Sequence, residues 1–179
     1  MNTLDDFLAQ VEKRAFKMAF IATGHQEDAL DIVQDAMMTL AERYYDKPFD
    51  EWPPLFHRIM QSKIRDWYRR QKVRNQWRQF FRLSKESEIE TDTIENAKDQ
   101  TNNQPDDKLE QSRAMQTLEK ELHLLPLRQQ QAFLLRVWEG LDVAQTAASM
   151  GCSQGSVKTH YSRAIHRLRE TLGEHYELK

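Results

Sequence analysis

The sequence predicts an all-α protein of two small helical domains joined by a flexible acidic linker. Three observations predict this fold class. Glycine and proline are sparse, at five each in 179 residues, and β-branched runs are nearly absent, a composition that favours helices. Apolar residues recur at helical spacing in both halves of the chain. Between the halves the composition becomes acidic and polar, which is typical of a segment without a core of its own.

Three helices are expected in the N-terminal domain, residues 1–83. Apolar spacing predicts the first helix over residues 3–23, and Gly24 follows it directly. The second helix is expected over residues 26–45. The third is expected over residues 53–74 or beyond, because two prolines at its start fit the first turn of a helix.

The predicted linker spans residues 84–110. It contains nine acids and three lysines, so its formal charge is 3 − 9 = −6, and it has few large apolar residues. Helical periodicity returns in the C-terminal domain, residues 111–179. There Pro126 opens one helix, and Gly140 ends it.

Residues 140–169 are typical of a helix-turn-helix. Asp142 can cap a short helix, Gly151 can supply the turn, and Ser153 can cap a second helix. One side of the second helix is apolar, and no acid occurs between Gln154 and Arg169. A short helix with a cationic, hydroxyl-bearing face suits the major groove of DNA. The alternative is an ordinary surface helix that carries some lysine and arginine.

The second predicted helix has an acidic face, which carries Asp28, Asp31, Asp35 and Glu42. Residues 26–42 contain no Lys or Arg, so these like charges destabilise the helix slightly. The helix N-terminus offsets part of this for Asp28 and Asp31, but Asp35 and Glu42 lie too far along the helix. Such a face fits docking on a basic partner. The alternative is a solvated acidic face with no partner.

A basic and aromatic segment follows at residues 65–82. Seven Lys or Arg residues accompany one Asp, and five aromatic residues are interleaved with them: Trp67, Tyr68, Trp77, Phe80 and Phe81. Cations that follow phosphates and rings on which unstacked bases can lie suit single-stranded nucleic acid. The alternative places the rings in the core, and Trp67 in particular lies on the apolar side of the helix.

In this order the features resemble the extracytoplasmic-function (group four) sigma factors of RNA polymerase. DALDIVQDAMMTLAERYY resembles their helix with the pattern D-x-x-Q-[DE], which Asp31, Gln34 and Asp35 match here. FHRIMQSKIRDWYRRQKVR resembles the helix that melts and reads the −10 element. The stretch from LPLRQQQAFLLRVW to the helix-turn-helix resembles the domain that binds the −35 element.

The resemblance implies a sigma factor that directs promoter recognition, DNA melting and initiation. Its partners would be core RNA polymerase, promoter DNA and an anti-sigma factor. The clamp helices of the largest polymerase subunit would meet Asp28, Asp31, Gln34 and Asp35. The −10 element would meet Gln61, Ser62 and Lys63, at the place of the family's specificity loop, and Arg65, Arg69 and Arg70. The −35 element would meet Ser156, Lys158, Thr159, Ser162, Arg163 and Arg167.

Composition and motifs argue against other classes. Cys152 is the single cysteine, so no internal disulfide is possible. The N-terminus does not resemble a signal peptide, and no apolar run approaches membrane-spanning length, so we expect a cytoplasmic protein without membrane insertion. Metal-ligand, phosphate-loop and nucleophile-elbow motifs are absent from the sequence, so we expect no catalytic residue, metal or cofactor. The remaining alternative is a helix-turn-helix regulator of the quorum type, which would need a ligand-binding or receiver domain ahead of it.

Overall fold

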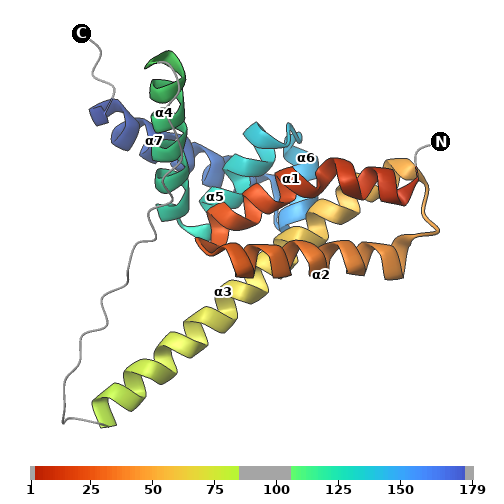
Figure 1. The fold of residues 1–179 in the computed structure, drawn as a ribbon, viewed down its shortest axis with the longest axis horizontal. Coiled ribbons are helices and arrows are strands. Elements are labelled where there is room, and N and C mark those ends of the chain that lie inside the picture. Colours follow the sequence, from red (N-terminus) through yellow and green to blue (C-terminus); the bar gives the residue numbers. More distant parts are fainter. Residues whose placement is uncertain (1–2, 85–105, 176–179) are drawn as a thin grey trace.

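The computed structural model describes residues 3–84 and 106–175, with side chains placed in 3–80 and 113–173. Every element within these residues is helical, which confirms the all-α class (Figure 1). In order, the elements are α1 (Leu4–Thr23), α2 (Gln26–Tyr44), η1 (Phe49–Glu51), α3 (Trp52–Ser84), α4 (Asp106–Leu124), α5 (Leu127–Phe133), η2 (Leu134–Trp138), α6 (Val143–Met150) and α7 (Gln154–His175).

The first helix begins and ends as its sequence predicts. The Thr3 hydroxyl accepts from the Asp6 amide while the Asp6 carboxylate accepts from the Thr3 amide, so the two residues form a capping box. At the other end Gly24 adopts φ 73°, a left-handed conformation in which its amide reaches the Phe20 carbonyl.

Helices α1, α2 and α3 form the N-terminal unit around one apolar core. The largest fully buried side chains are Leu40 from α2 and Phe56, Met60 and Ile64 from α3, each at most 1% exposed. The Phe7 ring of α1 meets the Phe56 ring edge to face, with centroids 6.0 Å apart. The second half of α3 then projects away from this unit (Figure 1).

The sequence predicts a helix over residues 53–74 or beyond, and α3 confirms it. The resemblance aligns Gln61, Ser62 and Lys63 with the family's specificity loop, whereas all three lie inside the continuous helix Trp52–Ser84. The physical reason is that no glycine or proline occurs between Leu55 and Ser84, so nothing breaks the helix. The buried series Phe56, Met60 and Ile64 keeps the helical spacing through the same turns.

The predicted linker differs from the structure at its C-terminal end. Helix α4 begins at Asp106, inside residues 84–110, which the composition predicts to be linker. Residues 106–110 contain no glycine or proline and include good helix formers, so helix propensity prevails over the acidic composition. Residues 85–105, the remainder of the predicted linker, lie outside the described residues.

The helix-turn-helix is confirmed in detail. Asp142 and Gln145 form a capping box at the start of α6, and Gly151 takes φ 63° at its end. The Ser153 hydroxyl then accepts from the Ser156 amide at 3.1 Å, which caps α7. The apolar side of α7 buries Val157, Ala164 and Leu168, so the opposite side of this helix faces solvent.

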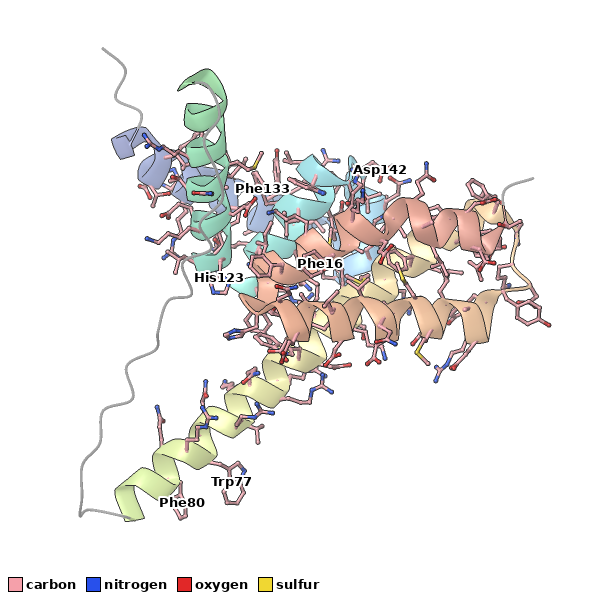
Figure 2. The ribbon with its side chains drawn as sticks, viewed as in Figure 1. Phe16, Trp77, Phe80, His123, Phe133 and Asp142 are labelled. Atoms are coloured by element: carbon pink, nitrogen blue, oxygen red, sulfur yellow. The ribbon has the colours of Figure 1, made fainter. Side chains whose placement is uncertain are left out.

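The C-terminal helices pack against the N-terminal unit rather than standing apart from it. Helix α6 contacts α3, and α4 contacts α1. Buried residues of both halves belong to one continuous apolar cluster. The His123 ring of α4 lies beside the end of α1 (Figure 2), with Nδ1 2.8 Å from the Ile21 carbonyl oxygen. The described helices therefore form one body from which the end of α3 projects.

Candidate functional site

The acidic face of α2 is exposed as a surface that a partner could contact. Asp31, Gln34 and Asp35 are exposed and Asp28 is half-buried. The other side of α2 buries Ala29, Ile32, Val33, Ala36 and Leu40. Glu42, further along the same helix, is exposed as well. Below, the name acidic face is kept for the part that the resemblance assigns to polymerase contact, which is Asp28, Asp31 and Asp35 together with Gln34.

Two large apolar side chains accompany the acids on the outer side of α2. Leu30 is 49% exposed and Met38 is 50% exposed. One cation from another helix also reaches the face, because Lys63 Nζ lies 3.7 Å from Asp35 Oδ2. Carboxylates flanked by exposed apolar groups suit a protein partner with a basic surface, since the apolar groups supply buried area and the charges supply selectivity.

The side chains expected to meet the −10 element are divided between buried and exposed positions on α3. Gln61 is 1% exposed; its amide nitrogen lies 3.0 Å from Met18 Sδ, and its side-chain oxygen has no partner. Ser62 and Lys63 are half-buried. Arg65 is also half-buried, whereas Arg69 and Arg70 are exposed. Only part of this set is therefore accessible in the described conformation.

The aromatic residues of α3 likewise divide into two groups. Trp67 is half-buried and packs against the core, as the sequence predicts, and the Tyr68 hydroxyl donates to the Ala22 carbonyl at 2.9 Å. Trp77 and Phe80 lie on the projecting end of α3, 58% and 65% exposed, with their rings edge to face (Figure 2). Exposed rings among arginines on a projecting helix are suited to stacking with unpaired bases.

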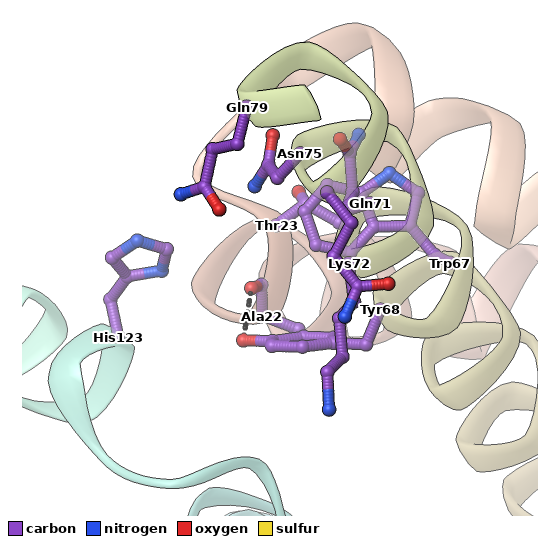
Figure 3. Close-up of a pocket in the computed structure, with 10 residues that line it drawn as sticks. Ala22, Thr23, Trp67, Tyr68, Gln71, Lys72, Asn75, Gln79 and His123 are labelled. Atoms are coloured by element: carbon purple, nitrogen blue, oxygen red, sulfur yellow. Dashed lines mark hydrogen bonds between the residues drawn. The ribbon is translucent and has the colours of Figure 1, made fainter. Parts of the chain in front are cut away.

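An open cleft of about 550 Å³ lies between α3 and the start of the C-terminal half. Figure 3 shows the amides of Gln71, Asn75 and Gln79 on one side and the His123 ring across from them. Trp67 and Tyr68 line its inner wall, and burial raises the pKa of the Tyr68 hydroxyl. The cleft offers amide donors and acceptors but no cluster of charges.

The recognition face of α7 is the best exposed of the predicted surfaces. Lys158, Thr159, Ser162, Arg163 and Arg167 are all exposed, and we call these five residues the recognition face. Ser156 is different: it is half-buried, and its hydroxyl lies 2.9 Å from that of Ser153 within the cap of α7. Its side chain thus already has a structural partner. Burial, together with the charges of Arg128 and Arg163, lowers the pKa of the neighbouring His160.

A polar cluster between the two halves, in which His57 and Glu139 are largely buried and Arg14 is half-exposed, was missed by sequence reasoning. Its members are Arg14 of α1, His57 of α3 and Glu139 after η2, and we call them the Glu139 cluster. Arg14 Nε lies 3.5 Å from Glu139 Oε1, and His57 Nε2 lies 3.6 Å from Glu139 Oε2. The Arg14 guanidinium also donates to the Trp138 carbonyl. These partners are far apart in sequence, so no local pattern could have identified them.

A second missed contact joins α3 to the turn of the helix-turn-helix. Arg65 Nη1 donates to the Met150 carbonyl at 3.0 Å, and Arg128 Nη1 donates to the same oxygen at 2.8 Å. Met150 is the last residue of α6, so two cations interact with the negative end of that helix dipole. The two missed contacts thus both join an arginine of the N-terminal unit to the C-terminal half.

His57 of the Glu139 cluster should make the free energy of unfolding depend on pH. Burial, reinforced by Arg14, lowers the pKa of His57 from its ordinary 6.5 to about 4, so the ring is neutral at neutral pH and its contact with Glu139 is not an ion pair. Between these pKa values the unfolded chain binds a proton that the native protein does not. We expect the free energy of unfolding to fall by about 2–3 kcal/mol as pH drops through this window.

The comparison that tests this expectation is His57→Gln against the parent protein. Urea unfolding from about pH 7 to about pH 4.5 should give a flatter profile for the variant. Burial raises the pKa of Glu139. Just above the ordinary pKa of a glutamate, the native protein therefore binds a proton that the unfolded chain does not, and Glu139 alone would make the protein more stable as the pH falls. Because Glu139 is present in both proteins, the difference between the two profiles isolates His57. Parallel profiles would show that the His57 ring does not titrate in this way.

The described residues contain neither a metal-ligand cluster nor a membrane-spanning helix. No group of three or more His, Cys, Asp or Glu residues is placed to hold a metal ion in the part of the chain that the structure describes. Among the same residues, no helix is both long and apolar enough to cross a membrane.

The C-terminal half of the chain matches a known protein family, and most of the chain is similar to known proteins. Residues 115–168 match the family model described as Sigma-70, region 4. The chain is 30% identical over 149 residues to the RNA polymerase sigma-E factor of Streptomyces avermitilis, covering 78% of this chain and 80% of that protein. It is 26% identical over 178 residues to the ECF RNA polymerase sigma factor SigE of Mycolicibacterium smegmatis, covering 98% of this chain and 63% of that protein.

Solved structures show the same fold. The sigma factor RpoE of Bartonella quintana, in complex with the anti-sigma factor NepR, matches with a TM-score of 0.63 and 24% identity, covering 94% of this chain and 96% of that one. CnrH, in complex with the cytosolic domain of CnrY, matches with a TM-score of 0.56 and 22% identity over 96% and 88% of the two chains. The family match of residues 115–168 and the 30% identical relative, on this fold, define a sigma-type transcription protein. More specifically, the chain belongs to the extracytoplasmic-function sigma factors of RNA polymerase.

Proposed function

We propose that this chain binds core RNA polymerase in the cytoplasm and directs it to promoters, where it assists DNA melting and initiation. The acidic face of α2 docks on the clamp helices of the largest polymerase subunit. The cations of α3 and its projecting rings hold the melted −10 strand. The recognition face of α7 enters the major groove at the −35 element. The chain itself has no active site, and the polymerase carries out the chemistry.

One observation carries this proposal most strongly. Three exposed faces of different chemistry lie on three separate helices: carboxylates with apolar neighbours on α2, cations with rings on α3, and cations with hydroxyls on α7. A regulator that binds DNA alone needs the last of these faces, but it has no use for the other two. A polymerase subunit that opens DNA needs all three.

We also propose that an anti-sigma factor restrains the chain. The two solved relatives described above are complexes with NepR and with the cytosolic domain of CnrY. The exposed apolar side chains on α2 and at the end of α3 are surfaces on which a helical inhibitor could pack.

Reconstitution with core polymerase tests the function. The purified chain should co-elute with core enzyme, and the resulting holoenzyme should produce discrete run-off transcripts from a pool of genomic fragments. Core enzyme alone is the control and should give none of these transcripts. A chain that binds genomic fragments but not core enzyme would instead be a helix-turn-helix regulator, and the proposal would be wrong.

A further inference from the structure

An apolar stripe runs along the projecting end of α3. Its members Val73, Trp77 and Phe80 are 51%, 58% and 65% exposed. At about 100° of rotation per residue, the three positions fall within about 60° of one another around the helix. The stripe is about 10 Å long, because the helix rises about 1.5 Å per residue. We call these three residues the α3 stripe.

The α3 stripe faces away from the rest of the molecule. Gln71, Asn75 and Gln79 occupy the opposite side of the helix, where they line the cleft toward the C-terminal half (Figure 3). Figure 2 shows the rings of Trp77 and Phe80 directed away from the C-terminal helices. Because this end of α3 projects beyond the other helices (Figure 1), a flat surface can reach the stripe.

Cations border the α3 stripe on both sides. Arg69 lies at one edge, Arg70 and Arg74 lie at the other, and all three are exposed. Arg69 also pairs with Asp66 at 3.4 Å, but residues 67–84 contain six Lys or Arg and no Asp or Glu. A short apolar stripe with aromatic residues, bordered by cations, is typical of a helix that lies in the surface of an anionic membrane.

Two other occupants fit the α3 stripe less well. The planes of the Trp77 and Phe80 rings meet at 80° with centroids 6.4 Å apart, so a stacked strand of bases can lie on at most one of them. Val73 offers no aromatic face to a base. A second copy of the same helix would bring two groups of cations together without acids to compensate them. A surface of anionic lipid suits the rings, the aliphatic side chain and the cations together.

We propose that the projecting end of α3 binds anionic membrane surfaces. The helix lies in the plane of the bilayer, the α3 stripe enters the headgroup region to a depth of about 5–10 Å, and the bordering arginines bind lipid phosphates. Lying on a membrane does not need the long apolar run that crossing one needs, and no described helix has such a run. This activity goes beyond the proposed function and does not depend on it, because it requires neither polymerase nor promoter DNA.

Vesicle sedimentation with the full-length protein measures this activity. The probes are vesicles of phosphatidylcholine alone and vesicles of phosphatidylglycerol and phosphatidylcholine in equal parts. At low salt the parent should bind the mixed vesicles at least about tenfold more tightly than the neutral ones, because each cation near an anionic surface raises the affinity about fivefold. Added salt should weaken this binding. A parent protein that binds neither kind of vesicle at low salt would overturn the proposal.

Replacing both rings tests the α3 stripe. Trp77→Ser with Phe80→Ser should lower the affinity for the mixed vesicles at least about tenfold, because two aromatic groups no longer enter the headgroup region. Both rings lie outside the apolar core of the described residues, so circular dichroism and the urea midpoint should match the parent. Leu124→Ser with Val137→Ser removes side chains that are 56% and 53% exposed elsewhere; this matched control should bind as the parent does. Equal binding by the ring variant and the parent would mean adsorption by charge alone, and the proposal would be wrong.

Neutralising two arginines tests the charged border. Arg70→Gln with Arg74→Gln should lower the affinity for the mixed vesicles about 20-fold, the product of two fivefold steps. Arg113→Gln with Lys120→Gln makes the same charge change at exposed positions of α4 and should leave the affinity nearly unchanged. If this control weakens binding as much as the α3 variant does, the binding follows net charge rather than the end of α3, which contradicts the proposal.

Tryptophan fluorescence distinguishes insertion of the stripe from contact with the surface. Binding to the mixed vesicles should shift the emission of the parent to shorter wavelengths. Trp77→Phe keeps an apolar ring, so it should still bind the vesicles but lose most of the shift. The other three tryptophans cannot supply it, because Trp52 is buried and Trp67 and Trp138 are half-buried. An unchanged emission spectrum in the vesicle-bound parent would overturn insertion of the stripe.

Oligothymidylate separates the membrane from nucleic acid as the partner of this segment. A parent protein that binds oligothymidylate but neither kind of vesicle would assign the end of α3 to nucleic acid alone, and the membrane proposal would be wrong. Failure to bind core enzyme would refute the proposed function. The vesicle measurements contain neither polymerase nor DNA, so they would still decide whether α3 binds membranes.

Discussion

Replacing Asp31 and Asp35 with lysine should weaken binding to core RNA polymerase at least 100-fold. Both carboxylates are exposed on α2, and the proposed partner surface is basic. The two substitutions reverse two charges, so two attractive contacts become repulsive. Each like-charge contact costs several kcal/mol at an interface. The loss should appear in fluorescence titration of labelled protein with core enzyme, and it should be steeper at low salt, where charges are less screened.

The fold should survive this double change, because neither side chain belongs to the apolar core. Asp35 does contact Lys63 at 3.7 Å, so a lysine at this position also repels a neighbour. Asp31→Asn with Asp35→Asn avoids that repulsion and should cause a smaller loss. Glu12→Lys with Asp50→Lys changes the charge equally at exposed positions off the acidic face and should bind core enzyme as the parent does. Wild-type affinity of the lysine double variant would remove the acidic face from the interface.

Elements held together by nearby residues could be predicted from the sequence. Thr3 with Asp6 and Asp142 with Gln145 are pairs three residues apart, and each forms a capping box. Gly24 and Gly151 end their helices because a left-handed conformation is inexpensive for glycine. Such signals need only a few residues and depend little on tertiary context.

Features that depend on distant partners could not be predicted. Nothing in the segment around Glu139 indicates that Arg14 and His57 will enclose it, because the sequence separation exceeds any helical or strand period. In the sequence Arg65 looks like a cation without a partner. Its partner is a backbone carbonyl of α6, and because every residue has a backbone carbonyl, the sequence does not mark this one. The acidic segment also seemed less helical than it is, since composition alone does not locate the start of α4 at Asp106.

Family resemblance and local sequence disagreed about α3 at one point. The resemblance aligned Gln61, Ser62 and Lys63 with the family's specificity loop, whereas apolar spacing predicted the helix that the structure has there. The continuous helix changes the expected mode of −10 recognition. A helix presents Ser62 and Lys63 at one end of a row that continues through Arg69 and Arg70, so a melted strand would run along the helix rather than into a loop.

Arg163→Ala should reduce transcription from a promoter of this holoenzyme by about 10- to 100-fold while leaving core binding intact. Arg163 is exposed beside Ser162 and Arg167 on the recognition face, and a good bidentate contact with a base contributes about 1–3 kcal/mol of discrimination. Arg169→Ala removes another exposed arginine of α7, two turns after Ser162 and not among the five residues of the recognition face, and is the matched control. Run-off transcription and a filter-binding titration of the holoenzyme measure the two effects.

The salt dependence of the same variant distinguishes the two roles that an arginine can have on DNA. If Arg163 holds a phosphate, the slope of log affinity against log salt should fall by about one, and all promoter sequences should weaken alike. If it reads a base, the slope should stay nearly constant, and preference should relax at one position of the −35 element. Arg163 is exposed one turn after Thr159 on the recognition face, a position from which its side chain can reach either a base edge or a phosphate. Equal transcription by Arg163→Ala and the parent would exclude Arg163 from both roles and move the recognition face toward Lys158.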